Sequence, residues 1–373
     1  MKTIGIVISQ SLGPTGHGAE SHTVLSFCDI FKGTYQVVLI GGEIIPNELK
    51  KYHSHPFISY TKLPRIFRFF LHLPVCFINT YIFCRGNKVD FLINGGGVWY
   101  AGFSILLVGK LFKINYLVRS AEDHFRYWKY VQSHSLRVYH FLITNLLSRC
   151  ILKRSKSVLT VGKLSKDYFI SYLNRNDSNT HYSVGPINRE RFNKNISFDL
   201  RKSLNFHKND HLVLYVGAIS GVKGTHFLPE IITHVKSKCN QTKFLIIGNE
   251  VEPGKRITTE IKKAGGNDVK ILPPVQHDEL HNYYKACDVL VFLCQVGVGY
   301  GQVNIEACLC DLPILSLNPG LDVEWCLKDA CNETPQQIAD RIIKRDYKVV
   351  KLPKEFDSDD IAANHLKLVK SLI

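Results

Sequence analysis

The chain has 373 residues, which is enough for two domains, or one large one, with a buried core. It is 45% hydrophobic and 21% charged, which indicates a globular protein, and no run approaches the ~18 unbroken apolar residues that a membrane-spanning helix needs. The formal net charge of +15 is too large to attribute to solubility alone, and it favours nucleic acid, an acidic membrane face or phosphorylated small molecules as partners.

The 11 cysteines are odd in number and show no zinc-like paired spacing. Most lie in apolar runs, as small buried hydrophobic residues do, so we expect reduced thiols and a cytoplasmic location. The first residues resemble a weak signal peptide without a convincing cleavage site, and they fit a buried first strand better.

The amino-terminal half alternates apolar strands with helices, as a doubly wound α/β domain does. The run Thr3–Ser9 predicts a central parallel strand, followed by a loop with Gly16 and Gly18 and by a helix from about Glu20. The glycine spacing is not that of a dinucleotide-binding fingerprint, so no nicotinamide site is predicted. Further strands are expected at Tyr35–Ile40, Val89–Ile93, Ile114–Val118 and Ser157–Val161.

Residues 63–85 form an unusually aromatic segment with interleaved arginines, and Pro64, Pro74 and Asn79 argue against a clean span. Such a mix is typical of an amphipathic segment in an anionic membrane interface, with basic groups on the lipid headgroups and phenylalanine rings in the acyl boundary. The alternative is an ordinary domain helix whose arginines extend to solvent. The basic composition of the whole chain favours the membrane interpretation.

A charged cluster follows the predicted strand Ile114–Val118 and includes Asp123 and His124. Loops at the carboxyl ends of strands are where α/β proteins place their chemistry, although exposed ion pairs of little energetic value would give the same composition. A long helix with one apolar side is expected over Tyr127–Lys156.

A polar, turn-rich stretch near residues 174–200 marks the expected domain boundary. We expect an amino-terminal domain over 1–190 and a carboxyl-terminal domain over 191–357. An amphipathic helix over 358–373 would cross back onto the first domain. The second domain repeats the pattern, with strands at Leu212–Val216, Lys243–Ile247, Val269–Leu272 and Asp288–Leu293 and a helix at Asp278–Ala286.

Two loops of the second half suit phosphate. The first runs from Gly217 and carries Lys223 among glycines, although it lacks the spacing of a Walker motif. The second lies in Cys294–Leu315, where glycines precede a short helix that carries Glu306 and is stopped by Asp311 and Pro313. Unpaired amides at a helix start attract phosphate, and a carboxylate just inside the helix could accept from ribose hydroxyls. The alternative is a glycine loop that only turns the chain.

The order of these elements and the run VGYGQVNIEACLCDLPI resemble the retaining glycosyltransferases of GT-B fold, and among them glycosyltransferase family 4. The stretches GHGAES, VGPINRERF, YVGAISGVKG and IIGNE extend the resemblance over nearly the whole chain. The resemblance implies two facing Rossmann-like domains. It also implies a UDP-, GDP- or ADP-sugar donor in the carboxyl-terminal half of the cleft, an acceptor in the other half and no required metal.

Position by position, the resemblance implies that Glu306 binds the donor ribose and that Lys223 neutralises the diphosphate as it leaves. Backbone groups of the carboxyl-terminal domain would bind the diphosphate, and a loop of the amino-terminal domain would approach it. These backbone groups are those of Gly217, Gly301, Gln302 and Val303 in the second domain, and those of Gly16 and Gly18 in the first.

Three departures from the family pattern bear on activity. Val298 stands where a first glutamate usually grips the donor sugar, and Ala218 stands where an arginine usually faces the diphosphate. Ala121 occupies the place of a frequent histidine, with Asp123 and His124 just beyond.

The expected function is therefore transfer of a sugar from a nucleotide donor to a lipid-linked or growing glycan at the cytoplasmic membrane face. Asp123 or His124 would orient the acceptor hydroxyl or the sugar. The rival is a noncatalytic subunit of a glycan-assembly complex that keeps the fold, and a nucleotide-sugar epimerase of the same architecture ranks last. Nucleic-acid binding would account for the charge but not for the glycine loops, and no recognised reader motif accompanies the basic residues.

Overall fold

The chain divides into two compact units in the computed structural model. Unit 1 holds residues 1–128, 138–187 and 355–373, and unit 2 holds residues 129–137 and 188–354. The structure describes the whole chain except residues 9–18, 43–44, 55, 57, 60–61, 64, 122–124, 126, 132–133, 186–188, 194, 196–198, 252–255, 295–300, 318–333, 353–355 and 357.

Unit 1 is built on a parallel sheet of seven described strands in the order β3-β2-β1-β4-β5-β6-β7. In β1 (Thr3–Val7), four of the five residues are buried, as expected for a strand covered on both faces. The other strands are β2 (Gln36–Ile40), β3 (His53–Ser54), β4 (Phe91–Asn94), β5 (Asn115–Ser120), β6 (Val158–Thr160) and β7 (Thr180–Tyr182).

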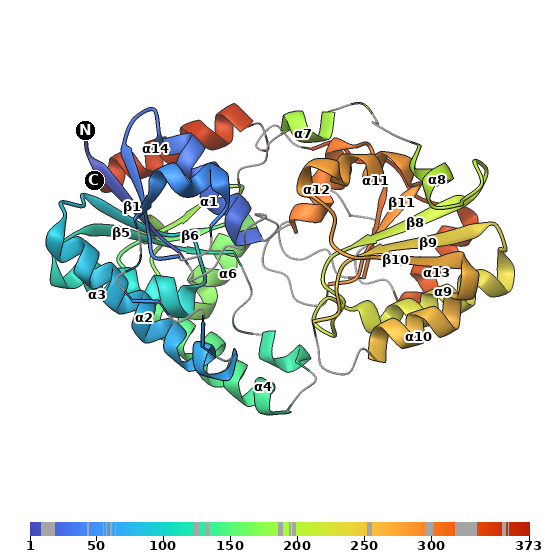
Figure 1. Ribbon diagram of the computed structural model, residues 1–373, viewed down its shortest axis with the longest axis horizontal. Helices are drawn as coiled ribbons and strands as arrows, with labels where there is room; N and C mark the ends of the chain where they lie inside the picture. The colour runs from blue at the N-terminus through green and yellow to red at the C-terminus, as the bar shows by residue number, and fades with distance from the viewer. Residues whose placement is uncertain are drawn as a thin grey trace. The chain divides into compact units, whose positions relative to one another are not determined.

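Helices cover both faces of this sheet, with α1 and α14 on one face and α2 and α3 on the other (Figure 1). Two segments, η2 and η4, are π-helical turns continuous with the helices that follow them. The helices of unit 1 are α1 (Ala19–Phe31), α2 (Arg65–Gly86), α3 (Phe103–Leu111), α5 (Ser148–Arg154), α6 (Lys163–Leu173) and α14 (Ser358–Leu372). The shorter turns are η1 (Asn47–Tyr52), η2 (Val98–Gly102), η4 (His140–Leu147) and η5 (Asp177–Asn179). The division between the two units falls within η3 (Tyr127–Tyr130) and within α4 (His134–Tyr139).

Unit 2 has a parallel sheet of five described strands in the order β10-β9-β8-β11-β12. Its strands are β8 (His211–Val216), β9 (Thr242–Ile247), β10 (Val269–Leu272), β11 (Val289–Phe292) and β12 (Ile314–Ser316). Its helices are α7 (Arg189–Asn193), α8 (Leu200–Ser203), α9 (Leu228–Lys238), α10 (Arg256–Gly265), α11 (Leu280–Ala286), α12 (Gln302–Leu309) and α13 (Pro335–Lys344). Three short turns complete it, η6 (Thr225–Phe227), η7 (Gly266–Asp268) and η8 (His277–Glu279).

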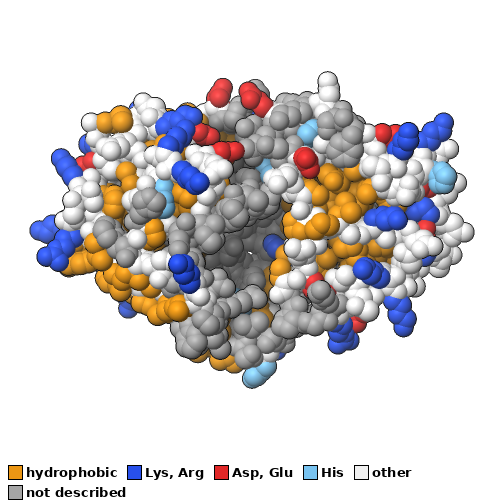
Figure 2. Space-filling model, viewed as in Figure 1, with side chains coloured by type: hydrophobic (Ala, Val, Ile, Leu, Met, Phe, Trp, Pro, Cys, Tyr) orange, Lys and Arg blue, Asp and Glu red, His pale blue; other side chains and the backbone are white. Residues whose placement is uncertain are grey.

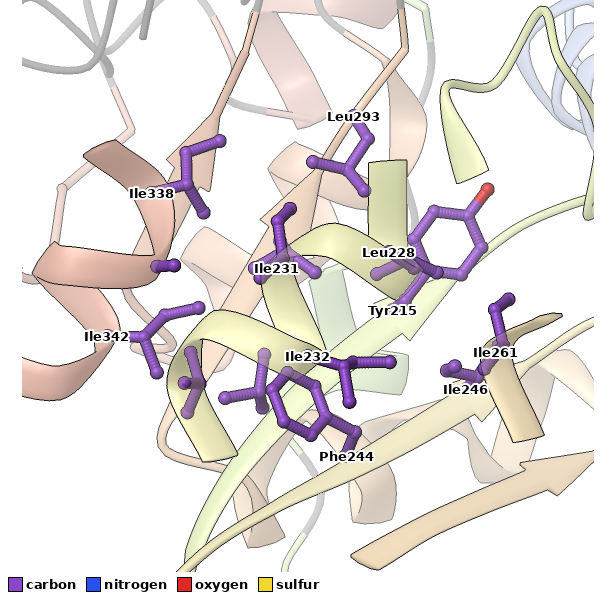
Figure 3. Close-up of a cluster of buried hydrophobic side chains, with 14 of the residues drawn as sticks. Tyr215, Leu228, Ile231, Ile232, Phe244, Ile246, Ile261, Leu293, Ile338 and Ile342 are labelled. Carbon is purple, nitrogen blue, oxygen red and sulfur yellow. The ribbon is translucent and has the colours of Figure 1, made fainter. Parts of the chain in front are cut away.

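The core of unit 2 lies between one face of its sheet and the helices α9, α10 and α13 (Figure 3). Helix α9 contributes an apolar stripe at the spacing of one helix face, formed by Leu228, Ile231, Ile232 and Val235. Ile231 and Ile232 are fully buried, next to Phe244 of β9 and Ile342 of α13. This packing fixes the strands whose carboxyl ends carry the predicted phosphate loops.

The two units share the doubly wound architecture that the sequence predicts, and both sheets are parallel. The main differences are short strands at sheet edges that the hydrophobic pattern did not reveal, namely β3, β7 and β12. The expected helix over Tyr127–Lys156 is confirmed over 134–154, where α4, η4 and α5 follow one another without a break, and η3 precedes them. Pro74 lies inside the continuous helix α2 and does not end it.

Candidate functional site

The strand order of unit 2 reverses between β8 and β11, since β9 and β10 extend the sheet on one side and β12 extends it on the other. Open α/β sheets bind ligands at the carboxyl ends of their strands, at the point of such a reversal. The loop after β8 carries Lys223, and the chain after β11 leads to the helix that carries Glu306. Both predicted phosphate loops therefore leave the two strands that flank the reversal.

The loop that carries Lys223 packs tightly against the end of β11. Gly224 has a φ of +70°, and a Cβ there would collide with the backbone carbonyl of Leu293. The Cys294 thiol also donates to the backbone carbonyl of Val222 at 3.7 Å. Lys223 itself is exposed, with its backbone N–H 3.4 Å from the Ser220 hydroxyl. The loop is thus held by its backbone while the ammonium group extends to solvent.

The first residue before α12 also contacts β11. Gly301 has a φ of +55°, and a Cβ there would lie 2.9 Å from the ring of Phe292, the last residue of the strand. Gln302 and Val303 then open the helix and are half-buried. The end of β11 therefore touches both the Lys223 loop and the start of α12. Helix starts carry partial positive charge, so an ammonium group and helix amides are brought to one end of the sheet.

Glu306 lies inside unit 2, with 2% of its surface exposed. Its carboxylate accepts from His277 Nε2 at 2.9 Å and from the Tyr284 hydroxyl at 2.8 Å. Both oxygens thus already have a protein donor, which the sequence did not indicate. Each carboxylate oxygen has a second lone pair, so a role toward ribose requires that Glu306 accept from ligand hydroxyls in addition to these two donors.

The partners of Glu306 are themselves held in place. Burial, with the Glu306 carboxylate adding to it, raises the pKa of Tyr284 well above its usual value, so its hydroxyl stays protonated and donates. The Phe192 ring of α7 lies edge-on to His277, with ring centres 5.5 Å apart, and also contacts Tyr284. Sequence analysis missed both partners. The only available signal was that His277 closely follows β10, at the same edge of the sheet.

The structure also describes Gly217 and Ala218, two positions at this edge that the sequence analysis singled out. The N–H of Gly217 donates to the Ile247 carbonyl of β9 at 3.0 Å, so this amide already bonds within the sheet. The carbonyl of Ala218 accepts from the Tyr215 hydroxyl at 2.9 Å. The backbone at Ala218 is therefore held by a buried tyrosine of β8.

The residues expected from unit 1, Gly16, Gly18, Asp123 and His124, lie outside the described residues, as does Val298 of unit 2. The strands that lead to the charged cluster are described. The side-chain carbonyl of Asn94 accepts from the backbone N–H of Arg119 at 2.6 Å, and its amide donates to the Arg119 carbonyl at 2.9 Å. These bonds fix the carboxyl ends of β4 and β5 to each other.

Within the described part of the chain, histidine, cysteine, aspartate and glutamate side chains do not assemble into a group of three or more that could hold a metal ion. No helix of the same part is both long enough and apolar enough to cross a membrane.

A comparison with known protein families finds a match in the carboxyl-terminal unit. Residues 197–343 match the family model of glycosyl transferases group 1. The matched segment lies within unit 2 and covers less than half of the chain. It includes the Lys223 loop, β11 and α12, whereas α7 with Phe192 precedes it.

A curated relative is the lipopolysaccharide 1,2-N-acetylglucosaminetransferase of Salmonella typhimurium, 24% identical over 146 residues. The aligned part is 37% of this chain and 38% of that relative, well under half of either protein.

Several solved structures match the whole chain. A sucrose-phosphate synthase from Thermosynechococcus elongatus has a TM-score of 0.77 at 18% identity, covering 100% of this chain and 99% of its own. Anabaena HepE, solved with UDP and glucose, has a TM-score of 0.74 at 16% identity and full coverage of both chains. At these identities the comparison concerns the fold, which is GT-B.

Proposed function

We propose that the chain is a retaining glycosyltransferase that moves a sugar from a nucleotide diphosphate donor to a lipid-linked or growing glycan. The observation that carries the proposal is the meeting of the Lys223 loop and the start of α12 at the end of β11. Among the possible UDP-, GDP- and ADP-sugars, a UDP-sugar is the first donor to test, because a structural neighbour was solved with UDP and glucose.

In this reaction, the carboxyl edge of the unit 2 sheet would have to stabilise the diphosphate as the leaving group. The bond between the anomeric carbon and the diphosphate oxygen breaks, while the acceptor oxygen bonds to the same face of that carbon. Negative charge grows on the diphosphate as it departs. Fixed helix amides at Gly301 to Val303 and the ammonium group of Lys223 would stabilise that charge without rearranging during the reaction.

Glu306 would hold the donor rather than take part in bond breaking. Its carboxylate is buried and oriented by His277 and Tyr284, and its remaining lone pairs suit ribose hydroxyls. Asp123 or His124 of unit 1 would orient the acceptor hydroxyl or the sugar.

Two departures support a second candidate, a noncatalytic subunit that binds nucleotide within a glycan-assembly complex. Val298 supplies no carboxylate for the donor sugar, and Ala218 supplies no cation for the diphosphate. A nucleotide-sugar epimerase of the same fold ranks third, because the acidic and histidine residues that such an enzyme needs are not recognisable in the sequence.

Incubation of the purified protein with UDP-, GDP- and ADP-sugars, followed by proton NMR of the products, tests the three candidates. Transfer or hydrolysis with retained anomeric configuration supports the proposal. Nucleotide binding without turnover supports the noncatalytic subunit, and a new sugar nucleotide of unchanged mass supports the epimerase.

The variant Lys223→Ala should lower kcat by about 100-fold to 1,000-fold, because it removes a cation from the developing charge. Lys262→Ala, which removes another exposed lysine, on α10, is the matched control and should leave kcat unchanged. Equal turnover in the two variants would contradict the role of Lys223.

A further inference from the structure

Helices α2, α3, η4 and α5 of unit 1 share a composition without acidic side chains. None of the four contains an aspartate or glutamate. In contrast, α1 and α14, on the opposite face of the sheet, each contain acidic residues. Exposed acids are therefore missing from a large helical surface. This asymmetry accounts for part of the net charge of the chain.

Large apolar side chains are exposed on the same surface, and we call them the apolar patch. Leu107 and Leu111 lie one turn apart on α3, and Leu111 is 62% exposed. Leu142, 50% exposed, lies with Phe141 and Leu146 on η4. Isolated exposed leucines are ordinary, but a contiguous exposed group is typical of an interaction surface.

The elements that carry the apolar patch, α3 and η4, both pack against η2, and α2 packs against α3. The Phe77 ring of α2 lies 6.4 Å from that of Phe103 at the start of α3, and Tyr81 lies 5.5 Å from Phe112 at its end. On the other side, Trp99 of η2 lies 6.3 Å from Tyr139, the residue before η4. The two parts of the apolar patch are therefore linked through η2. Figure 2 shows apolar side chains along the lower left of unit 1, where Figure 1 draws α2 and α3, beside lysine and arginine side chains.

Exposed basic residues are gathered at one edge of this surface. Helices α2, α3 and α5 each lead into the amino end of a parallel strand, so their last turns lie along the same edge of the sheet. The basic residues at these ends form what we call the basic row. It consists of Arg85, Lys88, Lys110, Lys113, Lys153 and Arg154, all exposed.

We infer that the apolar patch and the basic row dock unit 1 onto an anionic lipid bilayer. Leucine and phenylalanine side chains would enter the acyl boundary while the lysines and arginines contact the headgroups. A second copy of the chain fits less well, because a two-fold interface would bring the basic row close to its own copy, with no acid on these helices to offset the repulsion. The inference deepens the proposed transfer to a lipid-linked acceptor and rests on it, but it is measured independently of sugar transfer.

The docking surface differs in part from the one that the sequence suggested. The aromatic segment 63–85 forms α2, whose Val75, Phe83 and Cys84 are buried, while the side chains of 65–70 lie outside the described residues. Buried Asn79 bonds to the backbone of Ile58. The most exposed apolar side chains of the described helices come instead from α3 and η4, which the sequence analysis did not connect with lipid.

Co-sedimentation of the full chain with phosphatidylcholine vesicles, with and without phosphatidylglycerol, tests the inference. We expect binding only when the anionic lipid is present, and weaker binding as salt rises. The variant Leu111→Glu/Leu142→Glu should reduce partitioning by about tenfold or more. Val251→Glu/Val349→Glu, at two exposed valines of unit 2, is the matched control and should partition as the wild type does.

The contribution of the basic row is tested by Lys110→Glu/Lys153→Glu against Lys262→Glu/Lys263→Glu on α10 of unit 2, which makes the same change in net charge. Only the first pair should lose about tenfold or more in binding. Thermal stabilisation by UDP, measured on every variant, reports whether the fold and donor site are intact.

The inference would be overturned if the patch variants and their controls bound vesicles equally well. It would also be overturned if the wild type did not bind anionic vesicles. A dimer in sedimentation velocity that Leu111→Glu/Leu142→Glu dissociates, without vesicle binding, would assign the surface to a second copy instead. Failure of sugar transfer alone would contradict the proposed function and leave the vesicle result standing.

Discussion

Gly301 combines a backbone requirement with a position at the proposed donor site. Its φ of +55° is costly for residues with a side chain, and a Cβ would lie 2.9 Å from the Phe292 ring. We predict that Gly301→Ala lowers the free energy of unfolding by about 1–3 kcal/mol, measured by urea titration. The variant should also weaken UDP binding, because a shifted helix start no longer presents its amides correctly.

Gly86→Ala is the matched control for this change. Gly86 is exposed at the end of α2, and a Cβ there meets no atom within 4 Å. Its replacement should leave UDP binding unaltered. If Gly301→Ala bound UDP as tightly as this control, the start of α12 would not be the phosphate site.

Sequence analysis at the residue scale selected Lys223 and Glu306 from their places after predicted strands. The structure brings the loops of both to the end of β11, but the roles of the side chains stay predictions. The bonds of Glu306 to His277 and Tyr284 could not be predicted, since they join positions 29 and 22 residues apart. Such partners depend on how η8, α11 and α12 pack, which hydrophobic periodicity does not specify.

Among the elements, α14 returns from the end of the chain to pack against α1 of unit 1. His365 of α14 lies edge-on to Phe27, with ring centres 5.5 Å apart, and its Nδ1 donates to the Ile361 carbonyl at 2.9 Å. Burial lowers the pKa of His365 to about 4, and Arg119 acts in the same direction. The helix is therefore docked with a neutral histidine at its centre.

This burial predicts a pH dependence of stability. Between pH 6.5 and about 4, the unfolded chain protonates His365 while the folded chain does not, so the free energy of unfolding falls as pH falls through that window. The loss from this group is about 3 kcal/mol in total, from a shift of about two to three pKa units.

Chemical denaturation of the wild type and His365→Gln across this range measures the effect. Because glutamine does not titrate, the variant should show a flatter pH dependence, even if its stability at neutral pH is lower. Parallel curves for the two proteins would contradict the assignment to His365.

The central strands and their order along the chain could be predicted because parallel strands buried on both faces are continuous apolar runs. The edge strands β3, β7 and β12 have only two or three residues each, too few to produce such a run. In the sequence, Pro74 argues against a membrane span. Helix α2 continues through this proline because proline removes one hydrogen bond without preventing a helix that packs against its sheet.

At the scale of the whole molecule, the net charge of +15 predicted an anionic partner but not its location. The structure shows that basic side chains form two separate features, which the net charge of the chain does not distinguish. One is Lys223 beside the start of α12 in unit 2, and the other is the basic row of unit 1. The acid-free composition of α2, α3, η4 and α5 is visible in the sequence, but its meaning depends on the helices sharing one face of a sheet.

Calorimetric titration of UDP and uridine into the wild type, Lys223→Ala and Lys262→Ala tests most directly whether unit 2 binds a nucleotide through its diphosphate. We predict that the wild type and Lys262→Ala bind UDP at least about 100-fold more tightly than uridine. Lys223→Ala should lose about tenfold or more of that preference while keeping its affinity for uridine. Equal affinity of the wild type for UDP and uridine, or an unchanged preference in Lys223→Ala, would contradict the account.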